Sequence, residues 1–292
     1  MDRPSLAGAD EPRIVMASAA FIVAWKPHRM HCAELGPGGT ETASLAAWVF
    51  SRHPETAPAS FQENGSRPSV DGGLIHRLDY ETAGLVLFAR SPEALRVLRE
   101  AQARDAILKS YRLACAVGGE GLAGSEPRRG CPAGCTEPAW ARCLGEGDRL
   151  AEILSNETIA SYFRPYGPRG ARVACIAPAM REGRGRGSRS GRHGASRPRR
   201  GSPERLYVTR LRSASGGREG LGASVELTRG FRHQIRAHFA WIGLPLVGDS
   251  LYGGKGSPFL ALVATGIDFD DPETGLPLRI RDESIASLRA LP

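Results

Sequence analysis

One short segment constrains the fold more than any other part of the chain. Two apolar runs, residues 74–78 and 84–89, flank the polar tetrapeptide of residues 79–82. The runs are rich in Leu, Val, Ile and Phe, which favours buried β-strands, while the polar stretch between them favours a turn. The segment therefore predicts strand, turn and strand, and it presents Asp79 at the turn beside His76 and Arg77, where a carboxylate is well placed for chemistry.

The composition is that of a globular protein. Of the 292 residues, 41% are apolar, which is enough to fill a core. No run approaches the roughly 18 consecutive apolar residues of a membrane span. Residues 1–4 lack the apolar stretch of a signal peptide. We expect a cytoplasmic protein that does not enter a membrane, and a monomer.

The cysteines predict neither a disulfide framework nor a metal site. Six cysteines in 292 residues are sparse and irregularly spaced, so reduced thiols are expected. Cys131, Cys135 and Cys143 come closest to a zinc site, but their spacing misses the usual two-residue knuckle and no fourth ligand is evident. No metal and no other cofactor is predicted.

The positive charge is concentrated in one segment. Nine arginines and two glutamates between residues 181 and 205 contribute +7 of the formal net charge of +8. Residues 181–203 are low-complexity Gly, Ser and Arg, which favours disorder. Two interpretations stay open for this loop: a flexible tether for RNA phosphates, or a solvated charged linker.

The periodicity of apolar residues predicts a mixture of helices and strands. Residues 118–203 are punctuated by glycine and proline and read as an insertion. Ser91 and Pro92 form a strong helix start. The expected helices are residues 43–52, 92–106 and 233–242, and the expected strands outside the opening segment are 14–16, 21–24, 107–117, 206–211, 223–227, 259–263, 267–269 and 276–280.

Three segments, in this order, resemble the motifs of the RluA-like pseudouridine synthases. The first is His76-Arg77-Leu78-Asp79, followed by Thr82-Ala83-Gly84-Leu85. The second is Lys109-Ser110-Tyr111. The third runs from Leu227 to Gly253 through Arg232-His233-Gln234-Ile235-Arg236 and Gly248-Asp249. Trp25-Lys26-Pro27 is similar to the family's opening motif, with tryptophan in place of asparagine. The resemblance covers residues 20–117 and 206–281.

This resemblance implies an α+β fold with a mixed, largely antiparallel sheet flanked by helices. It also implies one catalytic domain over residues 13–292, interrupted by an embellished region at 118–205 and preceded by a flexible tail at 1–12. A two-domain alternative would place its boundary inside the embellished region. We favour one interrupted domain, because the third motif lies beyond that region and completes the same site.

The activity that the resemblance implies is isomerisation of uridine to pseudouridine in ribosomal or transfer RNA. Asp79 would be the nucleophile, and Arg236 would pair with it and keep it ionised. Tyr111 would lie against the uracil and assist proton removal from carbon 5. A surface arginine on an amphipathic helix is the competing interpretation of Arg236, and a core tyrosine is that of Tyr111.

Further residues are implied to contact RNA. Arg77 would enter the space that the flipped base leaves. His76 is expected to be a structural hydrogen-bonding partner, and His233 and Gln234 to be scaffold or phosphate contacts. Arg232 is displaced by one position from the family pattern, where Phe231 takes its slot, so RNA-backbone contacts should change.

Two competing functions can be weighed from the sequence. A catalytically inactive RNA-binding protein on the same scaffold is the alternative, and the intact Asp79, Tyr111 and Arg236 argue against it. A glycoside hydrolase would need a second carboxylic acid partner. Glu81 is close in sequence, but nothing in the pattern pairs it with Asp79.

Overall fold

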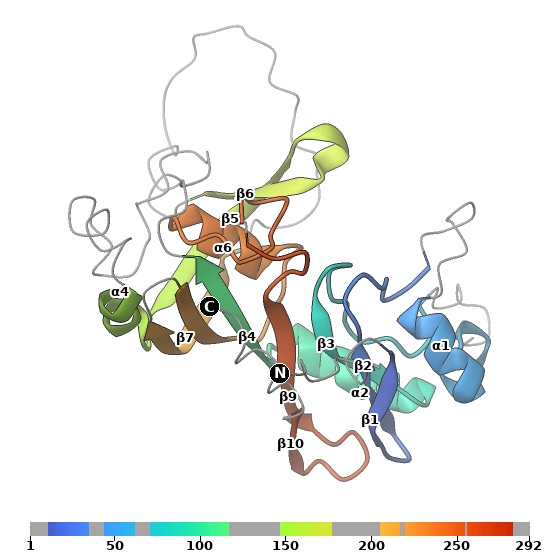
Figure 1. Ribbon diagram of the computed structural model, residues 1–292. Helices are drawn as coiled ribbons and strands as arrows, with labels where there is room; N and C mark the ends of the chain where they lie inside the picture. The colour runs from blue at the N-terminus through green and yellow to red at the C-terminus, as the bar shows by residue number, and fades with distance from the viewer. Residues whose placement is uncertain are drawn as a thin grey trace, which may run out of the picture.

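The computed structural model describes residues 11–34, 44–61, 71–116, 147–176, 205–216, 220–254 and 256–282 (Figure 1). The expectations for the loop at 181–203 and for Cys131, Cys135 and Cys143 lie outside these ranges, as does the expected tail at 1–12 except for its last two residues. Within them, no group of His, Cys, Asp or Glu side chains could hold a metal ion, and no helix has the length and apolarity to cross a membrane.

A single ten-stranded sheet organises the molecule. Its order is β1-β2-β3-β9-β4-β8-β7-β5-β6, with β10 paired to β9 beside this path. Neighbouring strands are antiparallel except β3 and β9, which are parallel. The strands are β1 Arg13–Ala17, β2 Phe21–Lys26, β3 Ala83–Ala89, β4 Leu108–Ala116, β5 Thr158–Tyr166, β6 Arg172–Ile176, β7 Tyr207–Gly216, β8 Gly220–Leu227, β9 Leu262–Asp270 and β10 Pro277–Arg281.

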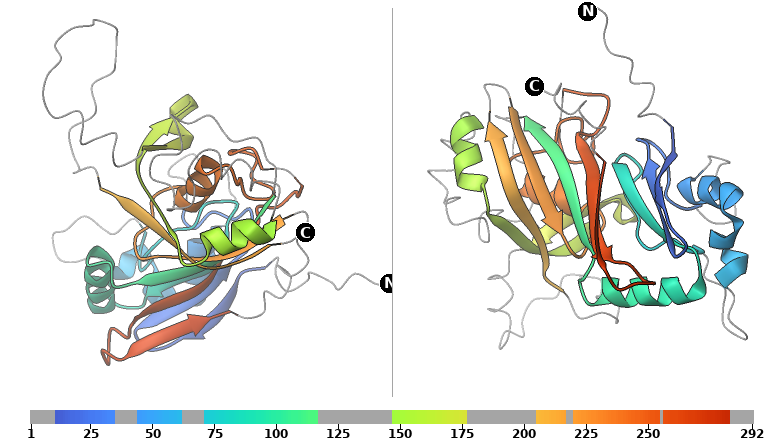
Figure 2. Two further views of the ribbon diagram at one scale, coloured as in Figure 1. Left: turned by 90° about the vertical axis from the view of Figure 1, so that its left-hand side faces the viewer. Right: turned by 90° about the horizontal axis from the view of Figure 1, so that it is seen from below.

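Alternating side chains place a hydrophobic core on each face of the sheet, since successive residues of a strand point to opposite faces. On β2, Ile22 and Ala24 join one core, while Phe21 and Val23 join the other. The first core also receives the apolar residues of α1 (Leu45–Arg52), α4 (Gly147–Leu154) and α6 (Gln234–Trp241), and the second those of α2 (Pro92–Ala103). Figure 2 shows the strands side by side with α2 along one edge of the view. Three short 3₁₀ helices occupy Pro54–Thr56, Pro58–Phe61 and Pro168–Gly170. The predicted α+β fold with a mixed, largely antiparallel sheet is confirmed.

The predicted strand at residues 74–78 is wrong. Only Leu74 forms an isolated bridge, to Phe88, and the chain then leaves the ladder. The backbone N–H of Leu78 donates to the thiol of Cys32, 3.1 Å away, in place of a neighbouring strand. Buried apolar side chains at Leu74, Ile75 and Leu78 gave the segment a strand-like composition although it is an irregular loop.

Two other boundaries differ from the predictions. Helix α2 ends at Ala103 and not near residue 106, because Asp105 has a left-handed backbone with φ +61°. The strands predicted at 259–263 and 267–269 are one strand, β9, which begins at Leu262.

The described part of the embellished region adds to the main sheet. β5 pairs with β7 through residues Thr158–Ser161 and continues into a hairpin with β6. Helix α4 packs against β7 and β8. The domain boundaries proposed from the sequence stay a prediction.

Candidate active site

The loop that carries Asp79 is fixed by a buried lysine. Lys26, at the end of β2, is fully buried, and its ammonium donates to the carbonyls of Pro27 (2.9 Å), Met30 (2.8 Å) and Tyr80 (3.2 Å). Burial lowers the pKa of Lys26 to about 8, and the negative charge of Asp79 opposes this shift. The backbone carbonyl of Tyr80, the residue after Asp79, is therefore held at the end of β2.

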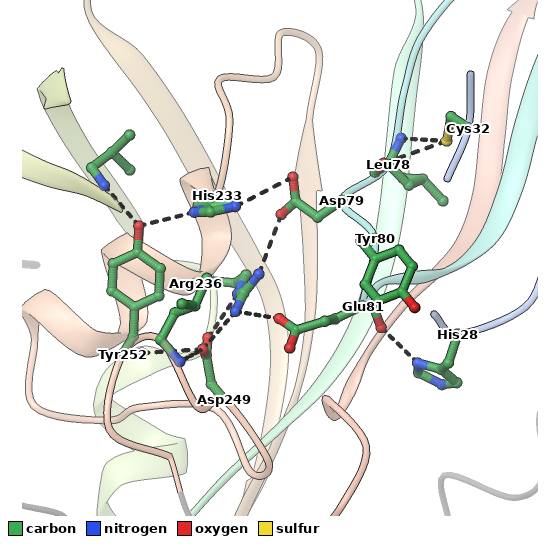
Figure 3. A network of polar contacts seen from close by, with 12 residues as sticks. His28, Cys32, Leu78, Asp79, Tyr80, Glu81, His233, Arg236, Asp249 and Tyr252 are labelled. Atoms are coloured by element: carbon green, nitrogen blue, oxygen red, sulfur yellow. Dashed lines mark hydrogen bonds and ion pairs between the residues drawn. The ribbon is translucent and has the colours of Figure 1, made fainter. Parts of the chain in front are cut away.

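Arg236 is the central cation of the site (Figure 3). It lies in the first turn of α6, and only 1% of its surface is exposed, which excludes the interpretation as a surface arginine. Its Nε and Nη2 donate to the two carboxylate oxygens of Asp249 at 2.8 and 2.7 Å, and Nη2 also donates to Glu81 at 2.7 Å. Its Nη1 lies 3.9 Å from Oδ2 of Asp79. The guanidinium thus stabilises negative charge on Asp79 while two other carboxylates hold it in place.

His233 approaches Asp79 from the other side. It precedes α6 with a left-handed backbone, φ +57°, and its Nε2 lies 4.0 Å from Oδ1 of Asp79. The hydroxyl of Tyr252 accepts the backbone N–H of Val173 at 2.9 Å and lies 3.2 Å from Nδ1 of His233. Burial raises the pKa of Tyr252 to about 12, so this hydroxyl keeps its proton and can donate it to Nδ1. The neutral tautomer of His233 then carries its hydrogen on Nε2, facing Asp79.

Tyr111 presents its ring to the same space. It lies on β4, it is almost fully buried, and its hydroxyl has no hydrogen-bond partner in the part of the chain that is described. Burial raises the pKa of Tyr111, and the negative charge of Asp79 adds to the shift. The phenol is protonated at neutral pH, so it offers a ring face and a hydroxyl donor.

A cavity of about 730 Å³ brings these groups together. This volume lies within the range, about 300–1,000 Å³, that small-ligand sites occupy. All eight site residues predicted from the sequence line the cavity: Asp79, Tyr111, Arg236, Arg77, His76, Arg232, His233 and Gln234.

The predicted RNA-contact residues differ in whether their polar groups make exposed or buried contacts with the protein. Arg77 is exposed and pairs with both oxygens of Asp71 at 2.6 Å. Arg232 is exposed and donates to the carbonyl of Gly170. Both can exchange these surface contacts for phosphates.

Gln234 and His76 are more deeply engaged with the protein. The carbonyl of the Gln234 side chain accepts the N–H of Phe231 at 2.9 Å, and its amide donates to the carbonyl of Val208 and to the hydroxyl of Thr209. His76 accepts the backbone N–H of Leu87 at Nε2, 3.3 Å away. These contacts hold the cavity wall.

The sequence reasoning missed three residues that organise the site. Asp249 and Glu81 hold Arg236, and Lys26 holds the loop of Asp79. Glu81 has no partner in the sequence pattern because its contact bridges 155 positions along the chain. Asp249 carried a signal that could have been read: an acidic residue inside the apolar stretch 244–252, where burial would demand a cationic partner.

Chemically, the site combines a carboxylate open to a cavity, a buried arginine beside it and an aromatic face. Comparison with known proteins agrees with this constellation. The sequence profile of the RNA pseudouridylate synthase family matches residues 20–241. The chain therefore belongs to this family, and the predicted resemblance to its RluA-like members is confirmed.

Two curated relatives share much of the chain. It is 30% identical over 220 residues to RNA pseudouridine synthase 2, chloroplastic, of Arabidopsis thaliana, which covers 75% of this chain and 38% of that protein. It is 43% identical over 197 residues to the protein of the same name in Oryza sativa subsp. japonica, covering 66% and 32%. The chain thus spans about a third of the length of these relatives.

Other similarities support the family and the fold. Ribosomal large subunit pseudouridine synthase D of Pseudomonas aeruginosa is 32% identical over 107 residues, covering 30% of this chain and 33% of that protein. Human RNA Pseudouridylate Synthase Domain Containing 1 superposes with a TM-score of 0.54 at 16% identity, covering 100% of this chain and 99% of the solved one. This structure shows that the fold is shared.

Proposed function

We propose that this protein isomerises specific uridines to pseudouridine in ribosomal or transfer RNA, with Asp79 as the nucleophile. One observation carries the proposal. Asp79, Tyr111 and Arg236, from sequence segments far apart, line a single cavity in which the guanidinium lies 3.9 Å from the carboxylate. Membership of the family and the name of the Pseudomonas relative support RNA as the substrate class.

The proposed reaction needs no external reagent. The carboxylate of Asp79 attacks the uridine, at the base or at the anomeric carbon, and the glycosidic bond to N1 breaks. The uracil turns, the anomeric carbon joins carbon 5, and the carboxylate leaves. Carbon 5 loses a proton and N1 gains one, so atoms and charge balance.

The burial of Tyr111 affects which role this residue can have in the proposed reaction. Its burial raises the pKa of the phenol, which makes the phenolate, the form that accepts a proton, less accessible. The proposal therefore gives Tyr111 the task of stacking on the uracil and orienting it through the hydroxyl. A direct role as the base for carbon 5 fits the raised pKa less well.

The decisive experiment is pseudouridine mapping of cellular RNA from cells that carry the wild-type gene, no gene or an Asp79→Asn variant. We expect one or more sites to depend on the gene and to be lost in Asp79→Asn. Asp268→Asn is the matched control, because Asp268 pairs with Arg281 and does not line the cavity. Unchanged modification in Asp79→Asn would overturn the assignment of the nucleophile. Gene-independent maps, together with retained RNA binding, would favour the inactive RNA-binding alternative.

A further inference from the structure

A buried lysine other than Lys26 lines the cavity, and the mechanism above does not use it. Lys109 lies on β4 and is 5% exposed. Its ammonium makes no hydrogen bond or ion pair with any residue within the described ranges. Lys26, buried to a similar degree, satisfies its ammonium with three carbonyls. The side chain of Lys109 is thus buried, while its ammonium opens onto the cavity without a protein partner among the described residues.

His76, which also lines the cavity, turns a donor and not an acceptor toward it. His76 accepts the N–H of Leu87 at Nε2, so the hydrogen of its neutral ring is on Nδ1. That buried Nδ1 has no hydrogen-bond partner among the residues that the structure describes. Burial lowers the pKa of His76 to about 3, and the positive charge of Lys109 contributes, which places the two side chains close to each other and keeps the ring neutral. His76 therefore provides no acceptor for the ammonium of Lys109.

The charge around Lys109 is also positive. Burial lowers the pKa of Lys109 to about 8, and the nearby guanidinium of Arg229 lowers it further. The carboxylate that opposes this effect, Asp105, is already bonded to Arg229 at 2.6 Å. Gly230 covers the ammonium closely, since a Cβ at this position would lie 4.0 Å from Nζ. A ligand group that fits here brings negative charge and hydrogen-bond acceptors, and a phosphate has both.

The position of Lys109 relates this subsite to the candidate nucleophile. Lys109 and Tyr111 are two residues apart on one strand, so their side chains emerge from the same face about 7 Å apart. Both line the cavity. A uracil against Tyr111 would therefore have its own backbone, and not a distant part of the RNA, within reach of Lys109.

We propose that Lys109 binds a backbone phosphate that flanks the target uridine. This inference rests on the proposed function, and it names the residue that positions the nucleotide rather than one that reacts. A buried lysine in the free protein is then a preformed phosphate site. Its cost in the free state is offset when the phosphate arrives.

The test measures binding of a short oligouridylate to the full chain, with Lys109→Met and Lys109→Arg compared against the wild type. We expect Lys109→Met to bind about tenfold more weakly at low salt and to reduce the slope of log K against log salt by about 0.7, the value for one phosphate of a single strand. Lys109→Arg should recover part of the affinity. Arg212→Met is the control, because the exposed Arg212 pairs with Glu226 and does not line the cavity.

Neutral methylphosphonate linkages, introduced one at a time, separate a phosphate contact from a contact with the base. At one linkage the wild type should lose as much affinity as Lys109→Met loses, and Lys109→Met should lose nothing more there. Equal losses in both proteins at every linkage would overturn the proposal and indicate a base carbonyl as the partner.

Urea unfolding of the free protein measures the stability of Lys109→Met. A lysine with a purely structural role would make this variant less stable than the wild type, whereas the proposal expects no loss of stability. Removing a buried cation that lacks a partner should leave Lys109→Met as stable as the wild type or more so. A destabilised variant would overturn the proposal.

Failure of the subsite and failure of the proposed function can be distinguished. If no cellular RNA is modified yet the oligouridylate results hold, the proposed function fails and the subsite stands. If modification occurs and Lys109→Met behaves as the wild type, only the subsite fails.

Discussion

At the scale of single residues, the site depends on how one guanidinium is shared. Two N–H donors of Arg236 are committed to Asp249, and Nη2 also reaches Glu81. Only Nη1 faces Asp79, at 3.9 Å, beyond hydrogen-bond distance. The charge of Asp79 is thereby stabilised without a direct bond that would occupy its oxygens, and those oxygens stay available for attack.

The two carboxylates that hold Arg236 should contribute unequally to stability. Asp249 is fully buried and bidentate, whereas the Glu81 side chain is 30% exposed. We expect Asp249→Asn to lower the free energy of unfolding by about 3 kcal/mol, because it leaves a buried charge poorly paired. Glu81→Gln should cost at most about 1 kcal/mol, because solvent screens that pair. Urea unfolding measures both, and equal costs would contradict this division.

A buried histidine should make the protein sensitive to acid. His238 bonds to the hydroxyls of Ser161 and Thr209, and burial lowers its pKa to about 3. The unfolded chain then binds a proton that the folded state resists, so stability is present above pH 6.5 and falls as the pH drops toward 3. We expect this residue to account for a loss of about 2 kcal/mol between pH 7 and pH 5.

The histidine contribution can be isolated with His238→Gln, whose amide can still bond both hydroxyls. The variant should be less stable than the wild type at pH 7, with the gap shrinking by about 2 kcal/mol at pH 5. Urea titrations at the two pH values give the comparison. A gap that does not change with pH would show that His238 does not titrate on unfolding.

At the scale of elements, the sequence predicted correctly those boundaries that interactions between neighbouring residues determine. Helix α2 begins where Ser91 and Pro92 indicated, because the serine hydroxyl accepts the N–H of Ala94 at 3.1 Å. The prediction of a strand at residues 74–78 was wrong because the backbone contacts of this segment are not local. Its backbone partners, Cys32 and Leu87, lie elsewhere in the chain, and no composition rule reveals that Leu78 bonds to a thiol.

The candidate site divides in the same way. Asp79, Tyr111 and Arg236 could be found through the resemblance of their motifs. Lys26 also lies in a matching motif, but neither its contact with the loop carbonyls nor the salt bridge of Glu81 over 155 positions leaves a periodic signal that would reveal it.

The start of α2 offers a test of a single element. Ser91→Ala should lower the free energy of unfolding by about 1 kcal/mol, and Ser91→Gly by only a few tenths, roughly, because glycine lets water reach the free N–H groups. Ser91 does not line the cavity, so RNA modification should be unchanged. Chemical unfolding of the two variants provides the measurement. An alanine variant as stable as the wild type would show that the cap contributes nothing.

At the scale of the whole molecule, the candidate site spans the short pairing between β3 and β9, which we call the joint between these strands. β1, β2 and β3 connect to the remaining strands through the parallel pairing of β3 with β9, which involves Ala83 with Val263 and Gly84 with Ala264. Asp79 lies in the loop that enters β3, whereas Tyr111 and Arg236 belong to elements beyond the joint. The distance between Asp79 and Arg236 therefore depends on how closely these two strands approach.

Gly84 permits that approach. It has φ +127°, and a Cβ at this position would lie 2.3 Å from the carbonyl oxygen of Ala264. We expect Gly84→Ala to push β3 from β9 and to lower the free energy of unfolding by about 3–5 kcal/mol through strain and overpacking. Because the loop of Asp79 moves with β3, RNA modification should fall by about 100-fold even where the variant is folded.

Gly275→Ala separates the clash from the backbone strain, because Gly275 also has a positive φ, +71°, but meets nothing within 4 Å. It should cost about 1–2 kcal/mol, the penalty for a left-handed residue with a side chain, and leave the modification rate unchanged. Urea unfolding and pseudouridine mapping of both variants make the comparison. If Gly84→Ala matched Gly275→Ala in both measurements, the geometry of the site would not depend on the joint between β3 and β9.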